Sequence, residues 1–251
     1  MQLIKTELEL EFPEGASFQQ PLSIYLYRRL TGMICRICCL DRASRCETCS
    51  LKDDCQYYWL TGQNFQFYSG VLCPAGPFEK RRFRAHDTLK TTFLWVGSCS
   101  KFAPYVDLLL EEMDGQIQRS PFVIRKLVHE PVEETNVSVC SLHLITPVSF
   151  KETQSFFEEM STYYKQNYEF DLSVPENGYS FIPGISMRGL QIKLPQGVKR
   201  LDGLLGDITF NKETNISSFW LTLGLGNGNC IGGGRVEADH SIYGSGNQTA
   251  H

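Results

Sequence analysis

Six cysteines lie close together in the first quarter of the chain, with a spacing that suits a metal site. They are Cys35, Cys38, Cys39, Cys46, Cys49 and Cys55. A C-x-x-C pair places two sulfurs on one short turn, and such pairs can supply the tetrahedral thiolates that Zn²⁺ prefers. The expected ligands of a structural zinc ion are Cys39, Cys46, Cys49 and Cys55. Cys35 and Cys38 remain alternatives to Cys39, and reduced thiols without a metal remain an alternative to zinc. Four thiolates leave no open position for a reactive water, so this module does not indicate catalysis.

Basic side chains beside aromatic residues or glycines form a second group that could do chemistry. In FEKRRFR, residues 78–84, cations that can contact phosphate stand between two phenylalanines whose rings can stack on bases. Arg28 and Arg29 stand beside Tyr25 and Tyr27, and three further cations lie later in the chain. Outside the arginine pair, the candidate phosphate contacts are Lys80, Arg81, Arg82, Arg84, Lys199, Arg200 and Arg235. For each place alone, a solvated surface is the alternative interpretation.

A glycine-rich run, GLGNGNCIGGG at 224–234, is the third unusual feature. Glycine loses more backbone freedom on folding than any other residue, so an ordered run indicates close approach to the backbone. No Gly-Lys-Ser/Thr follows, which excludes a Walker A loop, and no βαβ unit follows, which argues against a dinucleotide fingerprint. A flexible hairpin without function is the alternative.

The totals set limits on the protein class. The chain has 251 residues, 42% of them hydrophobic, which is enough for one large or two medium domains with real cores. Its net charge is −4, so nucleic-acid binding would have to depend on local patches. The N-terminus lacks the apolar core of a signal peptide, and no stretch reaches the ~18 apolar residues of a membrane helix. We therefore expect a soluble, cytoplasmic protein with no membrane partner and no disulfides.

Hydrophobic periodicity predicts the elements that position these residues. In the first half we expect a strand at 3–12, a helix at about 21–33, the cysteine module at about 35–58, a strand at 88–97, a helix at 100–115 and a strand at 121–134. In the second half we expect a strand at 136–150, a helix at 152–170, strands at 179–195 and 203–210, a helix at 216–226 and a strand at 235–238. This order predicts an α+β protein with two ferredoxin-like (RRM-like) domains in tandem, at 1–134 and 135–251. The cysteine module is inserted in the first domain.

The spacing of the glycines at 224, 226, 232 and 234 resembles the glycine-rich loop of the RAMP superfamily of CRISPR-associated proteins. Within that superfamily, the chain resembles the endoribonucleases that process precursor crRNA. RLDGLLGDITF followed by FWLTLGLGNGNCIGGG is similar to their closing segment, and ITPVSFK to the start of their second domain. The C-x-x-C-x5-C arrangement continuing as QYYWL is similar to a branch with a cysteine module, and the processing nuclease of type IV systems fits this description. Gly233 departs from the family, which usually has an apolar residue there.

The resemblance implies cleavage of CRISPR repeat RNA without a catalytic metal, by attack of a ribose 2′-OH on the adjacent phosphate. It also implies that Gly224, Gly226, Gly232 and Gly234 let the RNA backbone approach main-chain amides. Many members carry a histidine in or near the first helix, and this chain has none there. The candidate catalytic residues are therefore Arg28, Arg29, Tyr25 and Tyr27, the arginines stabilising phosphate charge and a tyrosine orienting an oxygen.

The implied partners are repeat RNA or crRNA and other subunits of a CRISPR effector complex. Two alternatives remain open at this point. The first is a non-catalytic RNA-binding RAMP subunit, which the missing histidine favours. The second is a zinc-containing protein-interaction domain without an RNA role.

Overall fold

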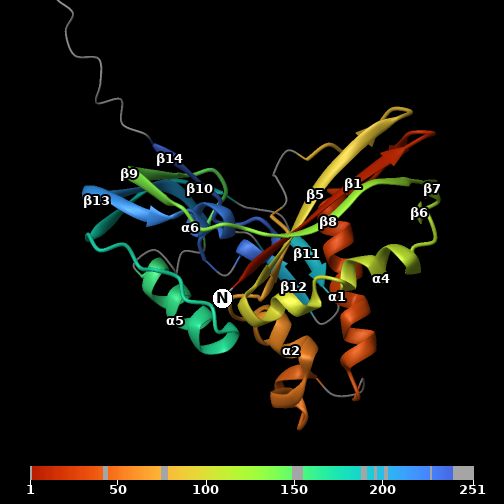
Figure 1. Ribbon diagram of the computed structural model, residues 1–251, viewed down its shortest axis with the longest axis horizontal. Helices are drawn as coiled ribbons and strands as arrows, with labels where there is room; N and C mark the ends of the chain where they lie inside the picture. Colours follow the sequence, from red (N-terminus) through yellow and green to blue (C-terminus); the bar gives the residue numbers. More distant parts are fainter. Residues whose placement is uncertain are drawn as a thin grey trace, which may run out of the picture.

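The structure is a computed structural model that describes residues 2–41, 45–74, 79–148, 155–187, 191–194, 197–200, 203–226 and 228–239. For 191–194 and 197–200 it describes the backbone alone. Figure 1 shows two antiparallel sheets that diverge from the middle of the molecule, with α1, α2 and α5 extending from the opposite side. No helix within these ranges is long and apolar enough to cross a membrane.

The first sheet has the strand order β3-β5-β1-β8, and each pair of neighbours is antiparallel. Its elements are β1 (Leu3–Phe12), α1 (Leu22–Cys38), β3 (Val71–Leu72), β5 (Asp87–Val96), α4 (Tyr105–Glu112) and β8 (Val123–Pro131). Strand β1 alternates as the sequence predicts, because Leu8, Leu10 and Phe12 are buried while Lys5 and Glu7 form an ion pair on the other face. The buried side of the sheet shares one apolar core with α1 and α4.

Helix α1 extends to Cys38, beyond the end at Met33 that the sequence led us to expect. Its buried stripe continues through Leu30 and Ile34, so apolar packing holds the additional turn in place. Cys35 and Cys38 therefore belong to a helix and not to a free turn.

The second sheet has the order β10-β13-β9-β14, again antiparallel throughout. Its elements are β9 (Asn136–Leu144), α5 (Phe156–Tyr168), β10 (Tyr179–Met187), β13 (Gly203–Ser217), α6 (Ser218–Leu223) and β14 (Val236–Asp239). Helix α5 buries Phe156, Met160 and Tyr164, as its periodicity predicts. The predicted mixture of helices and sheets is thus confirmed, and each half has the order strand, helix, strand, strand, helix, strand.

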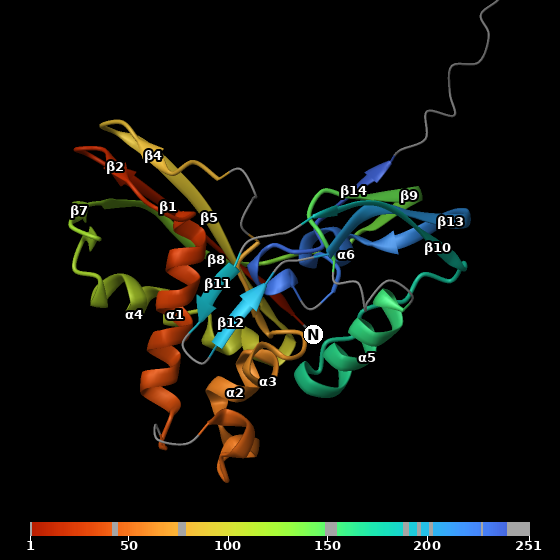
Figure 2. The ribbon, with the colours of Figure 1, turned by 180° about the vertical axis from the view of Figure 1, so that it is seen from behind.

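Short elements connect these parts. They are β2 (Ala16–Ser17), α2 (Gln56–Leu60), α3 (Gly62–Phe65), β4 (Arg82–Phe83), β6 (Gln116–Ile117), β7 (Ser120–Pro121), β11 (Gln191–Leu194) and β12 (Gly197–Arg200). Strands β11 and β12 form a hairpin that leaves the second half of the chain and lies against α1 in the first (Figure 2).

The two halves are joined by buried polar contacts. The Tyr168 hydroxyl lies 2.8 Å from the carbonyl oxygen of Tyr68 and 3.0 Å from that of Trp59. Trp59 Nε1 donates to the carbonyl oxygen of Asn167 at 2.9 Å. One apolar core extends through both halves, which fixes the position of α1 relative to the glycine-rich run.

Candidate functional site

Helix α1 carries the four candidate catalytic residues, but it does not present them to the same surroundings. Tyr27 is fully buried, and its hydroxyl donates to the carbonyl oxygen of Val71 at 3.1 Å. Burial raises the pKa of Tyr27 well above its ordinary value. The prediction of a catalytic Tyr27 was therefore wrong: its place in the i, i+3/i+4 stripe of Leu26, Leu30 and Tyr27 makes it a core residue. Tyr25 is half-buried and stays a candidate.

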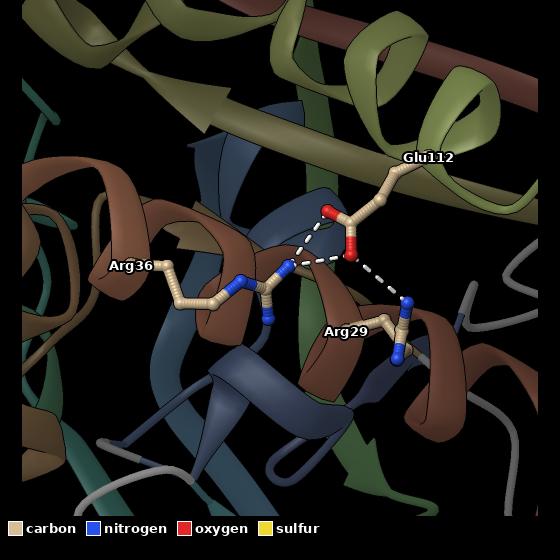
Figure 3. A network of polar contacts seen from close by, with 3 residues as sticks. All are labelled: Arg29, Arg36 and Glu112. Atoms are coloured by element: carbon tan, nitrogen blue, oxygen red, sulfur yellow. Dashed lines mark hydrogen bonds and ion pairs between the residues drawn. The ribbon is translucent and has the colours of Figure 1, made fainter.

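Arg28 and Arg29 both lie partly exposed on α1. Arg28 Nη1 donates to Gln20 Oε1 at 3.2 Å. Arg29 Nη2 lies 3.1 Å from Glu112 Oε1 on α4, and Arg36 Nη2 binds both oxygens of the same carboxylate at 2.6 Å. Figure 3 shows Glu112 between the two guanidinium groups. Because Arg29 and Glu112 are more than a third exposed, the pair contributes little to stability and a phosphate can displace it.

The basic segment 79–84 lies at the N-terminal end of α1. Glu79 Oε1 accepts a hydrogen bond from the backbone N–H of Ser23 at 2.9 Å, and the backbone N–H of Phe18 donates to the carbonyl oxygen of Arg81 at 2.9 Å. These contacts connect the segment to Gln20, the partner of Arg28, through the chain before α1. Segment 79–84 thus lies beside the N-terminal end of the helix that carries Arg28 and Arg29.

The four cations of this segment differ in their partners. Lys80 Nζ lies 2.6 Å from Asp87 Oδ2, and Arg81 Nη1 donates to the carbonyl oxygen of Gln19 at 3.4 Å. Arg82 and Arg84 are exposed and form no ion pair within the described part of the chain. Stacking by Phe83 on a base is not supported, because that ring is buried against Phe12 and Phe18; the other ring, Phe78, lies outside the described residues.

The four glycines that the spacing singles out share a backbone conformation. Gly224, Gly226, Gly232 and Gly234 have φ of 71°, 75°, 85° and 62°, the left-handed region that side chains disfavour. A Cβ at Gly234 would lie 1.7 Å from the carbonyl oxygen of Leu225. The glycine spacing therefore reflects four left-handed positions in a loop that packs on itself. The group that approaches the glycine backbone closely is another part of this same chain.

Most of the described amides of the loop and of Arg235 after it donate hydrogen bonds within the chain. Those that donate to carbonyl or hydroxyl oxygens are on Gly224, Leu225, Asn229, Ile231, Gly232, Gly233, Gly234 and Arg235. The expectation that Gly224, Gly232 and Gly234 offer amides to RNA phosphate was therefore wrong, because each of these donors is already satisfied. RNA contact by Gly226 and by the half-buried Arg235 stays a prediction.

The loop packs against the buried side of the first sheet beside α1. The backbone N–H of Cys73 donates to the carbonyl oxygen of Cys230 at 2.9 Å, next to the strand β3 that accepts the Tyr27 hydroxyl. The hairpin that carries Lys199 and Arg200 lies against α1 from the other half of the chain, although the side chains of these two residues lie outside what is described. We define the candidate surface by α1, segment 79–84 and the β11–β12 hairpin.

The cysteine module does not fit a four-thiolate site as it is folded. All six clustered cysteines are described, yet no three Cys, His, Asp or Glu side chains within the described ranges form a group able to hold a metal ion. Cys38 Sγ donates instead to Gln56 Oε1 at 2.9 Å, and Cys39 Sγ to the carbonyl oxygen of Asp41 at 3.4 Å. Burial, followed by nearby acidic groups, raises the pKa of Cys46 to about 11, which favours the protonated thiol. Zinc at Cys39, Cys46, Cys49 and Cys55 remains a prediction.

Sequence reasoning missed two carboxylate partners near the predicted cations. Glu112 follows a run of leucines and glutamates and carries no signal that it would pair with Arg29 across 83 residues. His86 stands two residues after Arg84, and its Nδ1 lies 2.9 Å from Glu11 Oε1. The signal for His86 was its place directly after the basic segment, but its carboxylate partner could not be inferred because it lies on another strand.

The comparisons with known proteins identify the fold of this chain and nothing further. No family model matches the chain, and no curated protein sequence matches it. The solved structure of the product of a Cas6-related gene from Pyrococcus furiosus is 10% identical and superposes with a TM-score of 0.50, over 95% of this chain and 99% of that one. The fold is Cas6-like. The resemblance drawn from the sequence is thereby confirmed at the level of the fold.

Two further solved structures are similar over most of their length. A CRISPR associated protein Cas6 is 14% identical, with a TM-score of 0.49 over 95% of this chain and 100% of that one. Csf5, a CRISPR-Cas type IV Cas6 crRNA endonuclease, is 13% identical, with a TM-score of 0.39 over 94% of this chain and 100% of that one.

Proposed function

We propose that this protein is a crRNA-processing endoribonuclease of the RAMP superfamily that cuts CRISPR repeat RNA without a catalytic metal and stays bound to the product. The observation that carries this proposal is that segment 79–84 and the β11–β12 hairpin, which both carry predicted cations, lie beside α1 in a Cas6-like fold. Separate cationic segments beside one helix suit the spaced phosphates of an RNA strand. The order of elements and the antiparallel sheets support two ferredoxin-like units in tandem, at 1–134 and 135–251.

The chemistry assigned to this surface needs cations close to the reacting phosphate. Guanidinium groups are cationic, so Arg28 and Arg29 can bind phosphate oxygens as charge develops on them. Arg29 would release the Glu112 carboxylate and bind a phosphate oxygen instead, so its positive charge would still be paired with a negative one. Tyr25 is the remaining tyrosine that could orient an oxygen of the substrate, because Tyr27 is buried.

The direct test is incubation of the purified protein with labelled cognate repeat RNA in EDTA, beside the same RNA with a 2′-deoxy sugar at the cut site. A single cut that the deoxy sugar blocks supports 2′-OH attack. Arg28→Ala and Arg29→Ala should lower the cleavage rate more than RNA affinity, and Lys165→Ala on α5 is a control cation outside the candidate surface. Equal losses of rate and affinity would contradict the catalytic role of the arginines.

A non-catalytic RNA-binding subunit is the second candidate function. The burial of Tyr27 and the Glu112 pairing of Arg29 favour it, since both reduce the chemistry available on α1. Salt-dependent binding of the repeat hairpin without any cut would select it. Other effector-complex subunits are proposed partners in either case.

Structural zinc in the cysteine module is proposed separately from the reaction. Its support is the spacing of the cysteines in the sequence. Metal analysis of the purified protein and of Cys46→Ser tests it, and zinc absent from both would contradict it.

A further inference from the structure

His86 lies in a turn with a left-handed backbone. Its φ is +66°, and its backbone N–H donates to the carbonyl oxygen of Phe12 at 2.8 Å. Histidine, asparagine and aspartate are the residues with a side chain that adopt this conformation most readily, so asparagine can replace histidine without a change of the turn. The side chain is 75% exposed, so packing does not explain why histidine occupies this place.

A carboxylate fixes the ring of His86. Its Nδ1 lies 2.9 Å from Oε1 of Glu11, whose side chain is only 11% exposed. Arg125 Nε binds the other oxygen of that carboxylate at 2.5 Å, and Arg125 and then His86 lower the pKa of Glu11 to about 2. An ionised carboxylate accepts and cannot donate, so Nδ1 carries a proton, and in the neutral imidazole the lone pair is then on Nε2. Within the described part of the chain, Nε2 has no hydrogen-bond partner.

Two other histidines can be compared with His86, and one of them is held at both ring nitrogens. Nδ1 of His129 lies 2.8 Å from Thr6 Oγ1, and its Nε2 lies 2.8 Å from Asp107 Oδ2. Its side chain is 27% exposed. His129 therefore has a structural role and offers no lone pair to a substrate.

The third described histidine, His143 on β9, is exposed and bound to a carboxylate as His86 is. Its Nδ1 lies 2.6 Å from Asp207 Oδ1. Its strand neighbour on β14 is Glu237, and Asp239 follows two residues later. This acidic surrounding repels phosphate, which excludes His143 from an RNA site.

The surroundings of His86 are cationic by contrast. Arg82 and Arg84 precede it on the chain, both exposed, and Lys80 reaches Asp87, the residue directly after it. The charged groups that face this turn are thus Glu11 from β1, Arg125 from β8, Asp87 from β5 and the cations of segment 79–84. That segment connects the turn to the N-terminal end of α1 through Glu79.

We propose that His86 is the general base of the RNA cleavage, with Glu11 as its positioning residue. In this step Nε2 takes the proton of the ribose 2′-OH while the O2′–P bond forms and the P–O5′ bond breaks. The leaving 5′ oxygen takes a proton from water, and the imidazolium returns its own to water, so the products are a 2′,3′-cyclic phosphate and a 5′-OH. The role of Glu11 is to hold the tautomer that leaves Nε2 unprotonated. This inference rests on the proposed function and names a residue for it outside α1.

The test compares single-turnover cleavage of the labelled repeat RNA by the full-length protein and its variants. His86→Asn keeps the left-handed turn and removes the base, so we expect a rate loss of about 10²- to 10⁴-fold with RNA affinity almost unchanged. His143→Asn is the matched control and should cleave as the wild type does. His86→Gly makes room for added imidazole, which should restore cleavage, and its melting temperature should not fall below that of the wild type.

The role of Glu11 has its own measurement. Glu11→Gln should slow cleavage in the wild-type background and have no further effect when combined with His86→Asn, because a positioning residue acts only through its partner. A merely structural Glu11 would lower the rate equally in both backgrounds.

The outcomes separate this inference from the proposed function. If the wild type cleaves and the cleavage rate of His86→Asn is within about threefold of the wild-type rate, the role of His86 is overturned. The proposed nuclease function would then still stand. Absence of cleavage by the wild type would overturn the nuclease itself and the base with it.

Discussion

Gly234→Ala tests whether the glycine-rich run serves the fold of this chain or the approach of RNA. The added Cβ would lie 1.7 Å from the carbonyl oxygen of Leu225 and within 3 Å of its backbone N and C atoms. It would also be placed at a φ of 62°. Since backbone atoms cannot rotate away as a side chain can, the two segments of the loop must separate.

The cost of that separation follows from the contacts it breaks. A left-handed alanine costs about 1–2 kcal/mol. The hydrogen bonds Leu225 N–H to Gly234 O at 2.8 Å and Gly234 N–H to Pro147 O at 3.0 Å are lost or stretched. Each contributes about 1 kcal/mol. We therefore expect the free energy of unfolding to fall by about 3–4 kcal/mol, which for a chain of this size lowers the melting temperature by about 6–16 °C.

Gly115→Ala is the matched control. Gly115 has a φ of 68°, but a Cβ there meets nothing closer than the Phe122 carbonyl oxygen at 4.0 Å. Only the backbone cost applies, so this variant should lose about 1–2 kcal/mol. The assay is thermal and urea unfolding of both variants, together with repeat-RNA affinity. If Gly234→Ala melts as Gly115→Ala does and yet binds RNA more weakly, the internal role of the loop is refuted.

Three further predictions follow from polar contacts. Tyr27→Phe removes the donor to the buried carbonyl of Val71 and should lower the free energy of unfolding by about 1–3 kcal/mol in urea unfolding, with the cleavage rate unchanged; a slower cut at unchanged stability would contradict it. Glu112→Gln frees Arg29 and should tighten repeat-RNA binding by about two- to fivefold in a filter-binding assay, and weaker binding would contradict this. The depressed pKa of Glu11, about 2 against an ordinary 4.5, stabilises the fold above pH 4.5, and this contribution is lost as the pH falls towards 2. Glu11→Gln should therefore flatten the fall of melting temperature over that range, and parallel curves for wild type and variant would refute it.

Elements with strong periodicity could be predicted from the sequence. The alternation in β1 and the apolar stripe of α5 agree with the buried residues of the structure, because burial on one face is a local property of strand and helix geometry. The end of α1 could not be placed, since its last turn is held by packing of Ile34. The spacing of glycines in 224–234 was detected, but it reflects backbone angles, so the reason inferred for it from RNA was wrong for Gly224, Gly232 and Gly234.

The cations of the candidate site could be predicted from the sequence, but their ion-pair and hydrogen-bond partners could not. Arg29 and Lys80 are visible in the sequence, whereas their partners lie 83 and 7 residues away and are chosen by the tertiary fold. Tyr27 could not be told from Tyr25 by type, because only the direction of each side chain on α1 separates a core residue from a surface residue. The sequence shows which residues are charged, and the tertiary fold determines which of these charges are paired with an opposite charge.

Under the proposed function, that neutralisation affects which polyanions a chain with a net charge of −4 would bind. On the candidate surface and beside His86, Arg29 pairs with Glu112, Lys80 with Asp87 and Arg125 with Glu11. A phosphate that binds one of these cations displaces a carboxylate, which then attracts a cation from solution. Fewer counterions are therefore released for each contact than the ~0.9 expected for a bare cation on duplex nucleic acid. A polyanion that reaches only one such pair gains little binding free energy from this exchange. An RNA whose phosphates reach several of these pairs at once gains most. The paired carboxylates thus favour a structured RNA over nonspecific binding.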